Sequence, residues 1–402
     1  MQLAQLPPLS LYVHIPWCLR KCPYCDFNSH EKRGDLPESQ YVDALVADLE
    51  ATLPQVYGRR VHTIFIGGGT PSLFAPASID RLVTAIRTRL PVDPEAEITM
   101  EANPGTFEQE RFRDFRAAGI NRLSVGVQSF DDARLAAIGR VHGADEARRA
   151  LEAALALFPT VNADLMYALP GQELSGAVAD VREAIAIGAP HISAYHLTLE
   201  PDTHFYRHPP QLPEDDAAAD MQEAIEALLG EAGFANYETS AFARPGHRAR
   251  HNLNYWMFGD YVGIGAGAHG KISFRDRIVR EVRERKPETY LRTALEGSAV
   301  RESREVPEAD LPFEFMLNAL RLTEGFPVTL FSERTGLALN SVERELAEAE
   351  AAGLITRDHA RIAPTARGRR FLNDLLERFL APRAPGARRT TISICSVGTA
   401  RS

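Results

Sequence analysis

Three cysteines lie within eight residues of one another, and their spacing suits a soft metal. Cys18, Cys22 and Cys25 form the pattern C-x-x-x-C-x-x-C directly after a short apolar run. Thiolates favour iron–sulfur clusters or zinc. A structural zinc site takes four protein ligands, and no fourth Cys or His has the spacing of a zinc finger. Three thiolates around a [4Fe–4S] cube leave one iron open, and that iron can chelate the amino and carboxylate groups of a small molecule.

Other metal-ligating residues near this loop have simpler interpretations. His14 and His30 are close in sequence, but His14 alternates with core-facing residues of the apolar run, which favours a packed role. Cys395 stands alone near the C-terminus, and we interpret it as an incidental thiol. A secreted disulfide protein would spread its cysteines through the chain. The clustering therefore indicates a thiolate site in a reducing compartment.

The composition favours a cytoplasmic protein that does not bind nucleic acid in general. The chain has 402 residues, of which 45% are hydrophobic, and a formal net charge of −9. A nucleic-acid-binding protein would present a basic surface. The first residues lack the basic and apolar regions of a signal peptide. No stretch approaches the roughly 18 to 20 apolar residues of a membrane span, so we expect at most peripheral membrane contact.

Short apolar runs alternate with amphipathic helical stretches through the first half of the chain. We predict strands over residues 11–14, 61–66, 97–101, 122–127, 162–167 and 191–197. The predicted helices cover residues 39–52, 79–90, 107–118, 131–138, 144–157 and 175–187. Six β–α units in a row imply right-handed crossovers and a parallel sheet. The expected fold class is α/β, with a partial (βα)6-type barrel.

The composition changes after residue 200 and again near residue 307. Near the C-terminus, helices over 313–321, 327–335 and 340–352, a wing over 353–356 and 361–364, and a closing helix over 366–379 predict a small winged-helix-like α+β domain. The predicted units are a lead (1–10), the barrel (11–200), a connecting segment (201–306), the small domain (307–380) and a disordered tail (381–402).

Polar residues stand at or near the carboxyl ends of the predicted strands. Gly67-Gly68-Gly69-Thr70 closes the second strand, and the later strand ends carry Glu101, Gln128, Asp164 and Thr198. In a parallel barrel these ends share one mouth, where ligands bind. Each could instead be a tight turn, a helix cap or a satisfied polar group. Their repetition along the chain favours a common site, which Arg140 could reach from the following loop.

These motifs, in this order, resemble the oxygen-independent coproporphyrinogen III oxidase-like branch of the radical S-adenosylmethionine superfamily. The likeness covers about residues 8–380 and includes YVHIPWCLRKCPYCDFNSH, FIGGGTPSLF, EANP, LSVGVQSF and DLMYALPGQ. It implies a [4Fe–4S] cluster on the three cysteines and a bound S-adenosylmethionine. The resemblance places that cofactor at Tyr12, Tyr24, Gly69, Thr70, Glu101, Gln128, Arg140, Asp164 and Thr198.

Two departures point to the haem-chaperone subfamily of this branch, the HemW-like proteins. Phe27 occupies a position where the decarboxylating enzymes typically have a further cysteine, and the long N-terminal extension of those enzymes is missing. The segment HNLNYW matches an H-N-x-x-Y-W motif of the subfamily. If it is helical, His251 and Tyr255 lie one turn apart. His251, Tyr255 and Trp256 are therefore candidates for haem contact, although they could simply pack between the two domains.

The resemblance implies a chaperone that binds haem and passes it to an acceptor protein, with a membrane-associated acceptor and an electron donor as expected partners. The alternative is a radical decarboxylase that converts the propionates of coproporphyrinogen III to vinyl groups. A weaker alternative is DNA binding by the small domain, but its arginines are interspersed with glutamates, which favours a lid or docking role. These arginines are Arg321, Arg334, Arg344, Arg357, Arg361, Arg367, Arg369 and Arg370.

Overall fold

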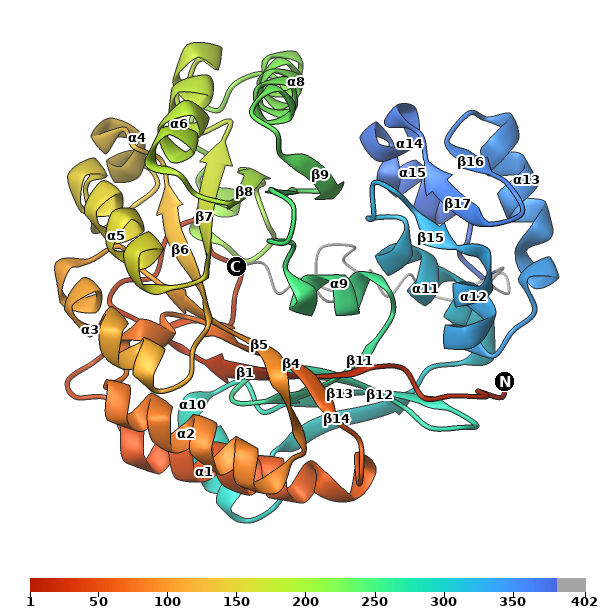
Figure 1. Cartoon of the computed structure of the whole chain (residues 1–402), viewed down its shortest axis with the longest axis horizontal. Coiled ribbons are helices and arrows are strands. Elements are labelled where there is room, and N and C mark those ends of the chain that lie inside the picture. Colours follow the sequence, from red (N-terminus) through yellow and green to blue (C-terminus); the bar gives the residue numbers. More distant parts are fainter. Residues whose placement is uncertain (382–402) are drawn as a thin grey trace.

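The computed structural model describes residues 1–381, except for the side chains of residues 106–108. Cys395 and all but the first residue of the predicted tail lie outside this range. Within it, none of the helices combines the length and hydrophobicity needed to cross a membrane. The chain forms one large mixed sheet with helices packed around it and a smaller domain beside it (Figure 1).

The large sheet has twelve strands in the order β14-β13-β12-β11-β1-β4-β5-β6-β7-β8-β10-β9. The consecutive strands from β11 to β8 in this order are parallel to one another. The parallel strands are β1 (Leu9–Ile15), β4 (Val61–Gly68), β5 (Val92–Ala102), β6 (Arg122–Gln128), β7 (Thr160–Tyr167), β8 (His191–His196) and β11 (Asp260–Ile264). The antiparallel strands are β9 (Ala235–Glu238), β10 (Ala241–Ala243), β12 (His269–Ser273), β13 (Ile278–Arg283) and β14 (Val300–Glu305).

Six of the parallel strands are those expected from the sequence, and the helices between them also agree. Strands β1, β4 and β6 are almost continuously buried, as a sheet covered on both faces requires. The covering helices are α1 (Glu38–Thr52), α2 (Pro76–Arg89), α3 (Thr106–Ala117), α4 (Asp132–Ala137), α5 (Ala144–Leu157), α6 (Leu174–Ile187), α8 (Asp215–Glu231) and α10 (Pro287–Leu295). Short helical turns lie at η1 (Leu53–Gln55), η2 (Pro71–Leu73) and α7 (His204–Arg207).

The seventh parallel strand comes from beyond residue 200 and was not predicted. Strand β11 pairs with the outer side of β1, with Leu9 opposite Asp260 and Val13 opposite Ile264. The antiparallel strands β12 to β14 extend the sheet from β11, and β10 and β9 extend it from β8. The sheet order thus ends in β14 and β9, so the parallel strands form a partial barrel.

The smaller domain has its own hydrophobic core. It contains η3 (Glu308–Asp310), α11 (Leu311–Ala319), α12 (Val328–Thr335), η4 (Leu339–Val342), α13 (Glu343–Ala351), α14 (Ala366–Arg370) and α15 (Leu372–Glu377). A small sheet joins β15 (Phe326–Pro327), β17 (Arg361–Pro364) and β16 (Ile355–Arg357). Phe315 is fully buried and makes edge contacts with Phe326 and Phe331. The order of helices and wing strands follows the sequence expectation.

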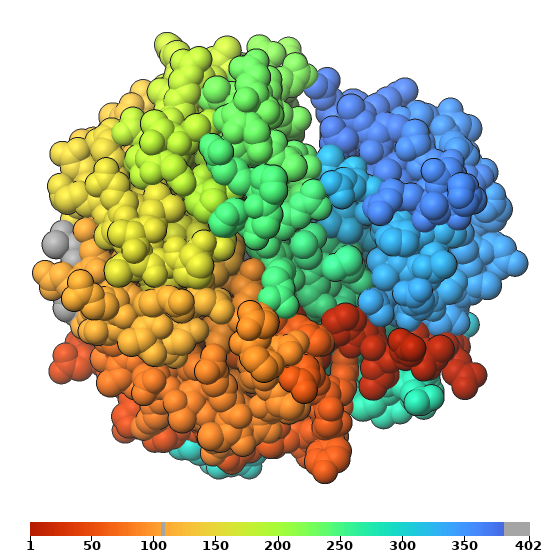
Figure 2. All heavy atoms as spheres, in the orientation of Figure 1, coloured from red at the N-terminus to blue at the C-terminus, as the bar shows by residue number. Residues whose placement is uncertain are grey.

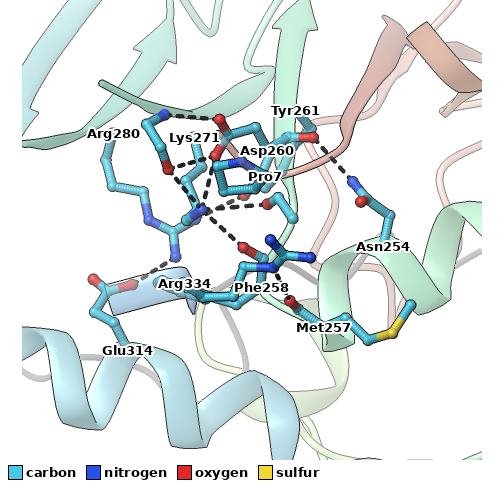
Figure 3. A network of polar contacts seen from close by, with 12 residues as sticks. Pro7, Asn254, Met257, Phe258, Asp260, Tyr261, Lys271, Arg280, Glu314 and Arg334 are labelled. Carbon is cyan, nitrogen blue, oxygen red and sulfur yellow. Dashed lines mark hydrogen bonds and ion pairs between the residues drawn. The ribbon is translucent and has the colours of Figure 1, made fainter. Parts of the chain in front are cut away.

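A buried polar network fixes this domain to the extended sheet (Figure 3). Lys271 Nζ lies 2.9 Å from Asp260 Oδ1, and Arg59 lies 2.8 Å from the other carboxylate oxygen. From the neighbouring strand, Arg280 bridges Tyr261 at 2.8 Å and Glu314 of α11 at 2.5 Å. Buried charges are stable only when they are paired and hydrogen-bonded. This network therefore holds the small domain in a defined position beside the barrel.

Candidate functional site

The three cysteines lie on a loop at the carboxyl end of β1. The short strand β2 (Trp17–Cys18) pairs with β3 (His30–Glu31), so the residues between them form a closed loop. Cys18, Cys22 and Cys25 are half-buried, and all three line one cavity of about 900 Å³. Within residues 1–381, no three His, Cys, Asp or Glu side chains are placed to hold a single metal ion. In an iron–sulfur cube each thiolate binds a different iron, so these sulfurs need not meet at one point.

The chemistry of the three thiols fits such a cluster. Burial raises the pKa of Cys18 to about 11 and also raises the pKa of Cys25. Without a bound metal these thiols hold their protons, and a metal removes that penalty because it binds the thiolate. The sulfur of Cys25 lies 3.4 Å from Ser29 Oγ. The donor set is thus three thiols on one wall of a cavity large enough for a further ligand.

Arg140 joins the cysteine loop to two strand ends. Its guanidinium donates to the Gly126 carbonyl at 2.7 Å and to Asn103 Oδ1 at 2.8 Å, and it lies 3.8 Å from Cys22 Sγ. Asn103 donates in turn to Thr70 Oγ1 at 2.9 Å. Asn103 was not among the predicted site residues, although its place in the EANP motif, two residues after Glu101, is a usable signal. Together these residues connect three strand ends into one polar wall.

The glycine triplet 67–69 at the end of β4 lies so close to neighbouring atoms that larger side chains would not fit. Gly68 has a φ of +117° and its N–H donates to Glu101 Oε2 at 2.9 Å. A Cβ on Gly68 would lie 2.5 Å from the His14 ring, and one on Gly69 would lie 2.5 Å from the Trp17 carbonyl oxygen. Only glycine fits so close to other atoms. The triplet therefore brings the backbone of β4 against the cysteine loop at the edge of the cavity.

Two acidic residues line the cavity, Glu101 of β5 and Asp164 of β7, and β6 lies between their strands. The pKa of Glu101 is raised to about 8, mainly by burial and in part by the charge of Asp164, while the hydrogen bond from the Gly68 N–H opposes the shift. Asp164 accepts hydrogen bonds from Ser124 at 2.8 Å and from Asn162 at 2.7 Å. A carboxyl group with a raised pKa is mostly protonated near neutrality, and a cation beside it would favour ionisation. The pair can therefore receive a positively charged ligand.

The structure brings most of the predicted cofactor residues to this cavity, but not Tyr12. Its hydroxyl donates to His14 Nδ1 at 2.9 Å, and His14 Nε2 donates to the Asn28 carbonyl at 3.0 Å. Both ring nitrogens of His14 are used in these bonds, in agreement with the packed role expected for it. The predicted residues that do line the cavity are Cys18, Cys22, Tyr24, Cys25, Gly69, Thr70, Glu101, Gln128, Arg140, Asp164, Thr198 and Trp256.

The haem candidates lie on α9 (Arg250–Trp256), and only one of them faces the cavity. His251 is fully buried, with Nδ1 2.8 Å from Thr63 Oγ1 and Nε2 2.8 Å from the Tyr255 hydroxyl. Neither His251 nor Tyr255 lines the cavity, whereas Trp256 does. Burial lowers the pKa of His251 to about 3, so the imidazole is neutral. In this conformation both nitrogens of His251 are bonded within the protein, which corresponds to the packing alternative.

The outer part of the cavity lies between the barrel and the small domain. One side is formed by α8 and the turn at residues 238–240, and the other by residues 366–374. The surface is hollowed between α8, in green, and the small domain, in blue (Figure 2). Arg370 and Glu223 form an ion pair across this gap. The cavity thus continues from the strand ends to an opening that both domains border.

Comparisons with known proteins agree with this architecture. Residues 12–183 match the Radical SAM superfamily, and residues 306–371 match the HemN C-terminal domain. Coproporphyrinogen III oxidase (HemN) from Escherichia coli has the same fold, with a TM-score of 0.80 at 24% identity over 93% of this chain and 90% of that one. The fold and the cysteine loop therefore define a radical SAM protein with a HemN-type C-terminal domain.

More similar relatives narrow this class. The chain is 49% identical to heme chaperone HemW of E. coli strain K12 over 94% of this chain and 100% of the relative. It is 34% identical to the mitochondrial radical S-adenosyl methionine domain-containing protein 1 of Bos taurus, over 92% of this chain and 87% of that protein. The chain belongs to the HemW family of radical SAM proteins.

Proposed function

We propose that this protein is a haem chaperone, which binds haem in the cavity above a [4Fe–4S] cluster and transfers it to an acceptor protein. The main support is the match to HemW chaperones along nearly the whole chain. The cavity supports it independently, because three thiols and a polar wall occupy one end while aromatic side chains and an opening between domains occupy the other.

The cluster is held by Cys18, Cys22 and Cys25 in this proposal, and S-adenosylmethionine binds against the strand ends. When bound, the cluster supplies one-electron chemistry and an open iron for chelation. Gly69 and Thr70 shape the cavity edge, Glu101 and Asp164 receive positive charge, and Arg140 positions Cys22 and Asn103. Tyr12 does not line the cavity and contributes indirectly, because its hydrogen bond holds His14 in position. Tyr24, Gln128 and Thr198 complete the lining.

We further propose that the protein works in the cytoplasm, accepts electrons from a separate donor and delivers haem to an acceptor that can be membrane-associated. We also propose that the chain consists of an N-terminal lead (1–10), a barrel (11–200), a connecting segment (201–306) and a small domain (307–380). The small domain serves as one wall of the haem compartment.

The test separates the chaperone from the decarboxylase. Anaerobically reconstituted protein is titrated with haem and followed by its Soret absorbance, and in parallel it is incubated with coproporphyrinogen III, S-adenosylmethionine and a reductant. We expect saturable haem binding, transfer to an apo-haem protein, and no protoporphyrinogen. Turnover of coproporphyrinogen without stable haem binding would support the decarboxylase instead.

A further inference from the structure

The segment HNLNYW lies in α9. Some of its polar side-chain atoms have hydrogen-bond partners within the protein, and others have none. His251 bonds Thr63 and Tyr255, and Asn254 donates to the Asp260 carbonyl at 2.9 Å. By contrast, Trp256 Nε1 and Asn252 Oδ1 are buried and have no hydrogen-bond partner in the described structure. Buried polar groups are almost always bonded, so two such atoms on one helix require an explanation.

Both unsatisfied residues line the cavity. Asn252 and Trp256 are four positions apart, which places them on the same face of the helix, and both belong to the cavity wall. His251 and Tyr255 do not line it. The polar atoms that lack partners are therefore those on the side of α9 where a ligand would lie.

A positive charge stands beside this pair. The guanidinium of Arg321, which follows α11, stacks over the Trp256 ring with its central carbon 4.7 Å from the ring centre. Arg321 also lines the cavity, and its charge acts on the buried carboxylate of Glu238 in the same wall. Rotating the Asn252 amide by half a turn exchanges its oxygen and nitrogen, which turns the acceptor into a donor. The indole N–H, the amide N–H and the guanidinium then form a set of donors suited to an anion.

We propose that Asn252, Trp256 and Arg321 bind a carboxylate of the cargo, which for haem is a propionate. This inference rests on the proposed function and adds the recognition of one end of the porphyrin. The carboxylate would give Trp256 and Asn252 the partners they lack, and Arg321 would balance its charge beside Glu238. His251 and Tyr255 hold α9 in position and do not touch the cargo.

The test compares haem with its dimethyl ester, which has the same iron and ring but no free carboxylates. The full-length protein and the variants Trp256→Phe and Asn252→Ala are titrated with each porphyrin. Trp256→Phe keeps an aromatic ring and removes the N–H, so the fold is preserved. A hydrogen bond to a charged group changes affinity by about tenfold or more. We expect wild type to prefer haem by at least about that factor, and each variant to lose the preference while its affinity for the ester stays unchanged.

One control variant and a third ligand complete the design. Tyr57→Phe removes a hydroxyl from a side chain that is 92% exposed and does not line the cavity, and should leave both affinities unchanged. S-adenosylmethionine binding should be the same in wild type and Trp256→Phe. If wild type binds both porphyrins equally, or the variants weaken both alike, the carboxylate assignment is wrong and the chaperone function stands. If wild type binds neither porphyrin, both the proposed function and this inference fail.

Discussion

The guanidinium of Arg140 lies 3.8 Å from the sulfur of Cys22, although the two residues are 118 positions apart in the chain. The same guanidinium is held by the Gly126 carbonyl and by Asn103. A fixed positive charge at this distance stabilises a thiolate, and the bonds to β6 and to the loop after β5 keep it there. The positive charge of Arg140 thus connects the cysteine loop to the ends of β5 and β6.

Replacing Arg140 should therefore weaken the binding of the iron–sulfur cluster. In Arg140→Gln the thiolate of Cys22 loses its cationic neighbour, and we expect the cluster to be lost to a chelator about tenfold faster, in keeping with the strength of a charge-assisted contact. The measurement is the decay of cluster absorbance in anaerobic protein after adding the chelator. Arg149→Gln, at an exposed position on α5, is the matched control. Equal decay in both variants would show that Arg140 has no such effect.

The glycines of the second strand end should not tolerate a methyl group. In Gly69→Ala the new Cβ would lie 2.5 Å from the Trp17 carbonyl oxygen, which is backbone and cannot turn aside. Overpacking of this kind costs about 1–3 kcal/mol and should also displace the cysteine loop. Denaturant unfolding and iron content both report it. In Gly176→Ala, within α6, the nearest atom is 3.6 Å away, so that variant should be as stable as wild type or slightly more stable. Full iron content in Gly69→Ala would be inconsistent with this packing.

Acid should destabilise the protein partly through His251. Burial lowers the pKa of His251 to about 3, whereas an unfolded histidine titrates near 6.5. Between these values the unfolded chain binds a proton that the folded chain does not, so stability is present above about pH 6.5 and falls as pH decreases towards 3. This one group contributes about 1.4 kcal/mol per pH unit. His142, with a pKa lowered to about 3, acts in the same direction.

Two acids oppose this trend. The pKa of Asp180 is raised by burial to about 6 and that of Glu101 to about 8, so each binds a proton more readily in the folded state. The variant His251→Gln separates the contribution of His251 from those of the other titrating groups. We expect the unfolding free energy to change between pH 5 and pH 6 by about 1.4 kcal/mol less in His251→Gln than in wild type, which corresponds to about one proton. An unchanged dependence would mean that His251 is not buried in its neutral form.

The Asp260–Lys271 pair in Figure 3 should be important for stability. Lys271 also donates to the Phe258 carbonyl at 3.0 Å. Breaking one side of a buried pair costs about 3–5 kcal/mol because the remaining charge loses its partner, although Arg59 retains part of the interaction here. Lys271→Met is compared with Arg81→Met, which removes an exposed pair with Asp43 and should have little effect. Similar unfolding midpoints for the two variants would contradict the role of the network.

The sequence predicts the parallel half of the fold well because local periodicity determines it. The helical spacing of 144–157 corresponds to α5 with the same bounds, and the apolar run 61–66 corresponds to β4, which continues to Gly68. The pairing of β11 with β1 joins Val13 to Ile264, and no local pattern specifies a contact over such a separation. For the same reason the extension by β12 to β14 was not foreseen.

In the candidate site, too, local sequence patterns predict some features, and others depend on contacts between distant parts of the chain. Strand-end position predicts that Glu101 and Asp164 lie near the cysteines, because parallel strands share one mouth. Sequence spacing also places His251 and Tyr255 on one helical face, but it does not say whether that face meets the cavity or the sheet. The orientation of that face depends on Thr63 of β4, which forms a hydrogen bond with the imidazole of His251. The unsatisfied atoms of Asn252 and Trp256 are likewise visible only once the helix is packed.

The central claim is that three cysteines hold an iron–sulfur cluster in the cavity. Its most direct test is anaerobic reconstitution of wild type and of the variant with Cys18, Cys22 and Cys25 all replaced by Ala, followed by iron and sulfide analysis. We predict about four irons and four sulfides per chain in wild type and none above background in the triple variant. Absence of iron and sulfide from wild type, or equal amounts in both proteins, would contradict the claim.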